Sequence, residues 1–411
     1  MTVNCWSDGL RERLRTVALE AGFSAAGVAR VPQAEEPRTS EEADRFADWV
    51  EAGYAGEMGY LQRRDEAGRL VRGALHRAMP WARSVVVCAW NYNASGPRSI
   101  EDALPGAGWI ARYAWMGRRR ENASLGSTDY HEELLARLRG VEALLVSEAG
   151  CETRCYVDTG PILERDFAAK AGVGWIGRNT CVLNQTLGSW LLLGVVVTSL
   201  PVEDGAAELG ATDRCGTCMR CVEACPTGAL LSSPDPGGVR EMDASRCISY
   251  LTIEKKGGID ESLRTGVGRN VFGCDICQEV CPWNRKAPVA AAELVEPRAE
   301  LVNPSLEWLA EMDSAAFKRQ FRGSPLERTG RKRLMRNVAI AMGNEMNAPD
   351  AGAGYLSRLD GWAAMPGDGA ADAALREAAE WARQKIRART EAAKGQEASA
   401  SLVGDVDRQS Q

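Results

Sequence analysis

The chain has 411 residues, 45% of them hydrophobic, and a formal net charge of −6 at pH 7. This length predicts two or three domains, and the acidic balance argues against general affinity for nucleic acid. No apolar run approaches the roughly 20 residues of a membrane-spanning helix, and no export signal is evident at the N-terminus. With 13 cysteines, we expect a reducing compartment, the cytoplasm.

The first 205 residues are predicted to form an α/β domain, because expected helices and strands alternate there. Ser7 is the expected N-cap of the first helix, and Gly22 is expected to end it. The expected elements are helix 7–22, strand 25–31, helix 41–53, strand 84–90, helix 129–149, a strand running into a turn at 156–161, helix 162–171 and strand 191–199. The polar segment 203–213 is expected to be a linker.

Eight cysteines lie between residues 215 and 281. They read Cys215-x-x-Cys218-x-x-Cys221-x-x-x-Cys225-Pro226, then Cys247, then Cys274-x-x-Cys277-x-x-x-Cys281-Pro282. The spacing is typical of bacterial ferredoxins, in which the cysteine before proline ligates the other cluster. One [4Fe–4S] cluster is thus assigned Cys215, Cys218, Cys221 and Cys281, and the other Cys225, Cys274, Cys277 and Cys247. We predict a ferredoxin-like two-cluster domain over residues 206–300.

Cys247 enters this assignment because Val271 stands where the second run would normally begin with a cysteine. Structural zinc is the main alternative, since Cys-x-x-Cys pairs also bind that metal. Two such extended runs, each ending in Cys-Pro, favour iron–sulfur clusters. The other five cysteines are expected to be small buried side chains without metal spacing: Cys5, Cys88, Cys151, Cys155 and Cys181.

Residues 301–390 are predicted to be helical, with 334–343 and 375–386 spaced like packed helical pairs. Residues 391–411 are polar and weakly periodic, so a disordered tail is expected. The segment 318–336 contains eight basic residues and one acid, Glu327. Such a run forms either a solvated face or a contact for nucleic acid.

Two clusters with a low reduction potential, about −400 mV in ferredoxins, suit an acceptor that is hard to reduce by one electron. A flavin and a corrinoid are both candidates, whereas the Cys-x-x-x-Cys-x-x-Cys run of radical S-adenosylmethionine enzymes is absent from the sequence. A histidine-ligated corrinoid would show Asp-x-His-x-x-Gly. Asp129-Tyr130-His131 begins that way, but Leu134 replaces the glycine, so His131 is interpreted as a helix-surface or core residue.

A family resemblance rests on the cysteine array and five further tracts, residues 129–131, 156–165, 171–180, 246–254 and 336–344. These tracts read DYH, YVDTGPILER, AGVGWIGRNT, RCISYLTIE and RNVAIAMGN. Together they resemble the epoxyqueuosine reductases, and the resemblance spans about residues 7 to 390. The chain departs from the family pattern by a longer segment between Tyr113 and Asp129.

The resemblance implies a nitroreductase-like corrinoid-binding domain, a two-cluster domain and HEAT-like C-terminal helices. It further implies cobalamin, two [4Fe–4S] clusters, an external low-potential electron donor, and reduction of epoxyqueuosine to queuosine at the tRNA wobble position. Asp158 matches the catalytic acid; otherwise it would be an aspartate that caps a turn. The positions that match the cobalamin lining are Arg63, Arg112, Asp158, Val182, Leu193 and Ser249. Those expected to face tRNA are Glu254, Lys256, Arg331, Lys332 and Arg333. A monomer without membrane contact is expected.

Two other classes stay open. A corrinoid-dependent reductive dehalogenase-like oxidoreductase would act on a small molecule, and the missing export signal and the basic C-terminal helix argue against it. An electron-transfer iron–sulfur protein would need neither Asp158 nor that helix.

Overall fold

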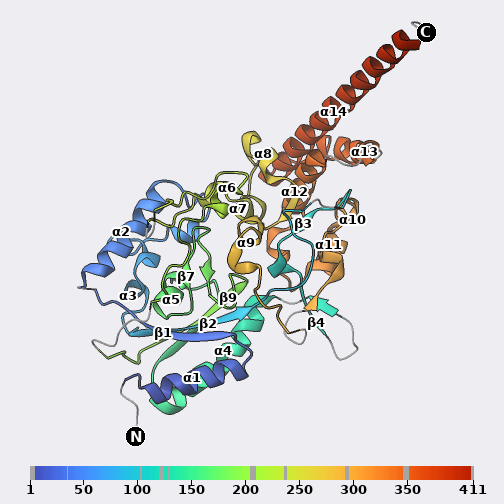
Figure 1. Cartoon of the computed structure of the whole chain (residues 1–411). Helices are drawn as coiled ribbons and strands as arrows, with labels where there is room; N and C mark the ends of the chain where they lie inside the picture. The colour runs from blue at the N-terminus through green and yellow to red at the C-terminus, as the bar shows by residue number, and fades with distance from the viewer. Residues whose placement is uncertain are drawn as a thin grey trace.

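The structure is a computed structural model that describes residues 5–34, 36–101, 104–119, 125–127, 129–203, 210–235, 238–291, 296–345 and 351–408. A four-stranded sheet organises the first half (Figure 1). Its spatial order is β1 (Ala25–Arg30), β2 (Ser84–Asn91), β9 (Leu191–Thr198) and β6 (Thr153–Tyr156), and every neighbouring pair is antiparallel. Helices and strands are mixed as expected, but the parallel sheet that strict α/β alternation predicts is not what forms.

A hydrophobic core lies on each face of this sheet, and successive side chains of β2 point into opposite cores. Val86, Cys88 and Trp90 pack into the core shared with α1 (Asp8–Glu20) and α4 (Tyr130–Ala149). Val85 and Val87 point the other way, into a second core that includes Phe167 of α5 (Glu164–Lys170). Figure 1 shows α1 and α4 on one side of the sheet and α5 on the other.

Local sequence signals explain most element ends in this half. Ser7 caps α1 as predicted, its hydroxyl accepting from the Leu10 N–H at 3.2 Å. Asp129 caps α4 in the same way. Helix α2 (Pro37–Glu51) begins before the expected residue 41, because a proline fits the first helical position. Strand β6 ends at Tyr156, so the segment 156–161, expected to be a strand running into a turn, lies almost wholly in the turn.

Short elements build the cysteine-rich part. Its helices are α6 (Arg220–Glu223), α7 (Ile248–Ile253), α8 (Glu261–Val267) and α9 (Ile276–Glu279), and its strand is β10 (Asn270–Phe272). Strand β10 pairs in parallel with β3 (Trp109–Ile110), so this part is joined to the first half by backbone hydrogen bonds. The remaining short elements are α3 (Leu75–Ala78), β4 (Met116–Arg119), β5 (Leu125–Ser127), β7 (Trp175–Ile176), β8 (Val182–Leu183) and β11 (Glu296–Pro297).

The C-terminal part is helical. It contains α10 (Leu306–Glu311), α11 (Ser314–Phe321), α12 (Arg331–Asn344), α13 (Ala351–Ala363) and α14 (Ala370–Arg408). Helix α12 is buried along most of its length, and one apolar core continues from α1 through the cysteine-rich part to α14. The prediction of a disordered tail from residue 391 is wrong as far as residue 408, because Ala, Glu, Lys and Gln continue α14 without a proline. Within the described ranges, no helix has the length and apolar character that crossing a membrane requires.

Candidate active site and cluster-binding domain

Asp158 lies in the turn after β6 and adopts the left-handed backbone conformation, with φ at 56°. That conformation is uncommon for a residue other than glycine and often marks a functional position. The Tyr130 hydroxyl donates to its Oδ2 at 2.5 Å, and 57% of the carboxyl side chain is exposed. No hydrogen bond from a described residue reaches Oδ1. One carboxyl oxygen is therefore fixed, and the other is available to a substrate.

His131 lies beside the same carboxyl. Its Nδ1 is 2.6 Å from Asp129 Oδ1, and its Nε2 is 3.9 Å from Asp158 Oδ2. The contact with Asp129 orients the ring so that Nε2 faces Asp158. The first turn of α4 thus brings Tyr130 and His131 together against Asp158.

Tyrosines and one ion pair surround this carboxyl. The Tyr113 ring packs edge-on against Tyr130, with centroids 5.8 Å apart. Burial raises the pKa of both phenols, so each retains its proton at neutral pH. Arg328, in the loop before α12, forms an ion pair with Glu254, and its positive charge acts on Asp129 as well as on the tyrosines. Three distant parts of the chain thus meet here.

The turn that carries Asp158 is anchored from behind by Arg72. Its Nη2 donates to the Gly160 carbonyl at 2.5 Å, and its guanidinium lies 5.6 Å from the centre of the Tyr60 ring. Gly160 has little space, because an added Cβ would come within 2.7 Å of the Tyr156 ring. Backbone and side-chain contacts therefore restrict the position of the Asp158 carboxyl.

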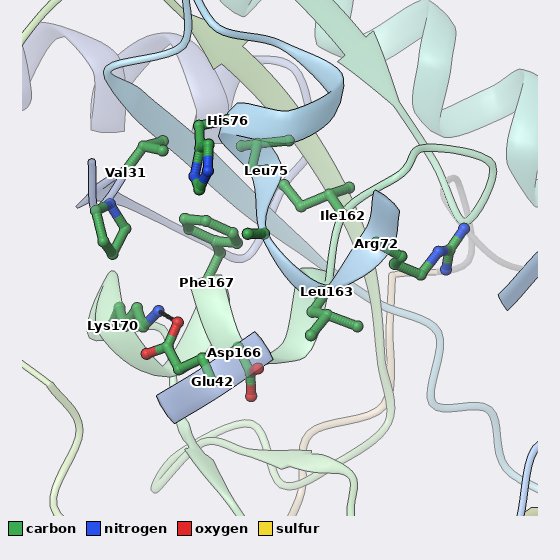
Figure 2. Close-up of a pocket in the computed structure, with 13 residues that line it drawn as sticks. Val31, Glu42, Arg72, Leu75, His76, Ile162, Leu163, Asp166, Phe167 and Lys170 are labelled. Carbon is green, nitrogen blue, oxygen red and sulfur yellow. Dashed lines mark hydrogen bonds and ion pairs between the residues drawn. The ribbon is translucent and has the colours of Figure 1, made fainter. Parts of the chain in front are cut away.

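A hollow that opens to solvent is lined by Arg72 and by Ile162 and Leu163, which follow this turn in the sequence (Figure 2). Its lining includes Arg72, His76 and Phe167, and the Lys170 ammonium reaches the Glu42 carboxylate at 2.7 Å across its floor. Asp158 is absent from the lining, as are the other residues predicted to contact a cofactor or tRNA. This hollow is therefore distinct from the candidate active site.

The first predicted ligand set surrounds a cavity. All four thiols, Cys215, Cys218, Cys221 and Cys281, line a space of about 360 Å³ beneath Trp283. Burial, with smaller contributions from the other three thiols, raises the pKa of Cys221 to about 12. Crowded thiols of this kind lose their protons readily only when a metal takes up their charge. The set fits the cluster that its spacing predicts.

The second set also comes together. Burial raises the pKa of the Cys274 thiol, with further contributions from Cys247 and Cys225, and Cys247 and Cys274 act in the same way on Cys277. Cys247 therefore lies near the other three thiols of this set. No three donors in the described ranges converge on one point as a single metal ion needs. Cluster ligands bind separate irons and need no such convergence.

The predicted cobalamin residues divide into two groups. Val182 and Leu193 belong to one apolar cluster with Tyr156, and Ser249 lies two residues after Cys247, in the first turn of α7. Ser249 therefore adjoins the second thiol set, and the other two adjoin the strand that ends before the Asp158 turn. Arg63 is exposed at the surface.

Arg112 has a different environment. Its side chain is only 8% exposed, donates to Asn93 at 2.7 Å, pairs with Glu279 at 3.5 Å, and lies 4.3 Å from the centre of the Trp190 ring. Only its buried Nε lacks a hydrogen-bond partner among the described residues. These contacts give Arg112 a structural role between the first half and the cysteine-rich part.

Several of the residues predicted to face tRNA already form hydrogen bonds or ion pairs within the protein. Arg331 donates to the Met312 carbonyl, Lys332 pairs with Asp372 at 2.7 Å, and Arg333 donates to the Ile253 carbonyl. Lys256 is exposed. Arg336 is fully buried against the carbonyls that follow α7. Part of the basic run therefore stabilises the fold, and its exposed cations are Lys318, Arg319, Arg322, Arg328 and Lys332.

Sequence reasoning missed Tyr113, Tyr130, His131 and Arg328 as neighbours of Asp158. The DYH tract was a usable signal, because an N-capping aspartate places the next two side chains at one helix end. Arg328 gave no comparable signal within its charged run.

Comparisons with known proteins agree with this architecture. Residues 214–284 match the model "4Fe-4S double cluster binding domain", and residues 72–159 match "Epoxyqueuosine reductase QueG, DUF1730". Epoxyqueuosine reductase of Xanthomonas campestris is 34% identical over 354 residues, covering 84% of this chain and 90% of the relative. That of Escherichia coli is 34% identical over 340 residues, covering 82% and 81%.

Solved structures agree as well. A crystal structure of epoxyqueuosine reductase with an epoxyqueuosine-modified tRNA-Tyr stem loop has a TM-score of 0.73 at 28% identity, covering 92% of this chain and 90% of that one. A Bacillus subtilis structure with its catalytic aspartate loop swung out of the active site also scores 0.73, at 27% identity and the same coverage.

A mixed helix–sheet domain that presents a positioned carboxyl beside a double [4Fe–4S] domain defines an iron–sulfur oxidoreductase. The zinc alternative is thereby set aside. The chain belongs to the epoxyqueuosine reductase family.

Proposed function

We propose that this chain reduces epoxyqueuosine in tRNA to queuosine, with electrons that pass through two [4Fe–4S] clusters to cobalamin. The observation that carries the proposal is the Asp158 carboxyl, fixed by Tyr130 and faced by His131, in a member of this family. A similar structure contains an epoxyqueuosine-modified tRNA stem loop, which supports tRNA as the substrate.

The reaction requires protons from the protein or solvent. Converting an epoxide to an alkene takes up two electrons and two protons and releases one water. Asp158 donates one proton to the departing oxygen through its free Oδ1, while Tyr130 keeps the carboxyl oriented. His131, held by Asp129, is placed to return a proton to Asp158. A positioned acid of this kind contributes about 10²-fold or more to the rate.

Cobalamin would supply a strongly reducing centre when bound. Val182, Leu193 and Ser249 are the residues that would hold it. Ser249 follows Cys247 of the second thiol set, and Val182 and Leu193 pack in one cluster with Tyr156, which ends the strand before the Asp158 turn. In this proposal the first domain is nitroreductase-like and the C-terminal helices are HEAT-like.

The tRNA would approach over Glu254, Lys256 and Arg328, with the exposed cations of α11 contacting phosphates. The remaining parts of the proposal are a monomer in the cytoplasm, supplied by an external low-potential electron donor.

The test is expression in a strain that lacks its own epoxyqueuosine reductase, followed by nucleoside analysis of its tRNA. The wild-type chain and the control Asp8→Asn, at an exposed position of α1, should restore queuosine. Asp158→Asn keeps the size of the side chain but cannot donate the proton, and epoxyqueuosine should accumulate. Full restoration by Asp158→Asn would remove Asp158 from the mechanism.

A further inference from the structure

The first thiol set lies at the surface of the cysteine-rich part. The residues on either side of Cys215 and the residue before Cys218 are exposed, as is Pro282, which lines the same cavity. The second set is more enclosed, because Asp275 and Gln278, each next to one of its thiols, are buried. An electron that comes from outside the protein therefore reaches the first set more easily.

Four exposed cations lie at this opening. Arg220, on α6, lines the cavity itself, and Arg214 lies next to the first thiol of the set. Arg285 and Lys286 come two and three residues after Trp283, which also lines the cavity. No hydrogen bond or ion pair joins any of these four side chains to a residue that the structure describes. All four charges are therefore available to a partner.

Acidic groups nearby do not cancel this charge. Asp213 is already paired with Arg240, and Glu223 is exposed one turn further along α6. Asp235 is exposed as well, and its backbone carbonyl accepts from Arg178 at 3.3 Å, in the same guanidinium contact that holds the first thiol run. Among the described residues, four exposed cations thus outnumber two acids without an ion pair. The opening is locally positive in a chain whose net charge is −6.

Apolar side chains lie among these cations. Pro282 is exposed, and Met219 and Trp283 are half-buried. The Trp283 ring is held edge-on against Trp175, with centroids 5.1 Å apart. Apolar side chains with charges around them are typical of protein interfaces, and brief electron-transfer encounters use the smaller ones. Charges at the edge of such an interface chiefly raise the rate of encounter with a partner of opposite charge.

We propose that this cationic face, made by Arg214, Arg220, Arg285 and Lys286, docks an acidic electron-transfer protein that reduces the first cluster. One electron leaves the reduced centre of the partner and enters the oxidised cluster, while no covalent bond forms or breaks and no proton moves. A redox protein fits better than RNA, because only a redox partner gains from cations placed beside a cluster. The inference rests on the external donor of the proposed function, but it concerns the clusters alone.

The test uses the whole chain with both clusters, without tRNA or cobalamin, and a reduced plant-type ferredoxin of acidic composition as the donor. Rapid-freeze electron paramagnetic resonance distinguishes the reduced four-iron clusters from the two-iron centre of this ferredoxin. The variants are Arg285→Glu/Lys286→Glu and the milder Arg285→Gln/Lys286→Gln. The control Arg15→Glu/Arg358→Glu changes the net charge as much as the first variant does, at exposed positions of α1 and α13.

At low salt, the glutamate variant should be reduced by ferredoxin at least about tenfold more slowly than wild type, because charge complementarity raises encounter rates by roughly 10- to 1,000-fold. The glutamine variant should lie between the two, and the control should match wild type. The difference should shrink as salt is added, because screening shortens the reach of exposed charges to about 3 Å at 1 M. All proteins should keep about eight irons per chain, as two four-iron clusters require; if the glutamate variant does not, the glutamine variant carries the test.

Reduced methyl viologen, a small cation, is the comparison reductant and should reduce the glutamate variant at least as fast as wild type. Three results would overturn the proposal. One is an unchanged rate with ferredoxin, and another is equal slowing with both reductants, which would place the defect in the cluster. The third is an unchanged ferredoxin rate together with weaker tRNA binding, which would assign the face to RNA. These rates are measured without tRNA, so failure of the tRNA reaction would leave them unaffected.

Discussion

Glu164 gives a prediction that can be worked out from the structure. It begins α5, six residues after Asp158, and its Oε1 is buried without a hydrogen-bond partner among the described residues. Burial, together with the nearby charge of Asp158, raises the pKa of this carboxyl from 4.5 to about 7. Between pH 4.5 and about pH 7, the folded protein therefore holds a proton on Glu164 that the unfolded protein has already released.

Proton linkage determines whether this carboxyl makes the folded protein more or less stable as the pH rises. A group with a raised pKa in the folded state costs stability as the pH rises above the pKa of the unfolded chain, and the cost is complete above the folded pKa. For Glu164 this window runs from 4.5 to about 7. The full cost is on the order of 3 kcal/mol. Glu164→Gln removes the titration and retains the size of the side chain.

The assay is urea unfolding of cluster-loaded protein at pH 5 and pH 8, followed by tryptophan fluorescence. Glu164→Gln should unfold near the wild-type urea concentration at pH 5 and at a clearly higher one at pH 8. Glu152→Gln, at an exposed position, is the matched control and should follow wild type at both values. An advantage of Glu164→Gln that is equal at both pH values would refute this account of the buried carboxyl.

Three further results are expected. Cys247→Ala should lose the second cluster and keep the first, with about four irons left per chain, and two intact clusters would refute the ligand assignment. Arg319→Glu should weaken tRNA binding and lower the salt slope by about 0.7 to 0.9 without moving the unfolding midpoint. Arg333→Glu should also lower that midpoint, because its guanidinium donates to the Ile253 carbonyl; equal stability in both variants would argue against this difference. Tyr130→Phe should slow turnover by about tenfold, because its hydrogen bond to Asp158 is lost. An unchanged rate and pH profile would show that this hydrogen bond does not contribute to turnover.

The sequence predicted what depends on spacing and local signals. Ser7 as N-cap, the buried strand at β2 and the grouping of the thiols around Cys221 and Cys274 all follow from short-range patterns. Placing Cys247 with the second set needed only a count of thiols.

What the sequence could not predict depends on contacts between distant segments. The antiparallel order of the sheet is set by pairing across long separations, and alternation of helices and strands does not specify it. The engaged state of Arg333 and Arg336 depends on the carbonyls at the end of α7, some 80 residues away. His131 is close to Asp158 only because α4 and the turn after β6 meet.

The most direct test of the proposed function uses purified, anaerobically prepared protein loaded with cobalamin. It is mixed with a low-potential electron donor and tRNA that carries epoxyqueuosine, and the nucleosides are then examined by mass spectrometry. We expect the modified nucleoside to lose one oxygen atom and become queuosine, in a reaction that requires both cobalamin and the donor. Epoxyqueuosine that persists unchanged, with both clusters intact and cobalamin bound, would contradict the account.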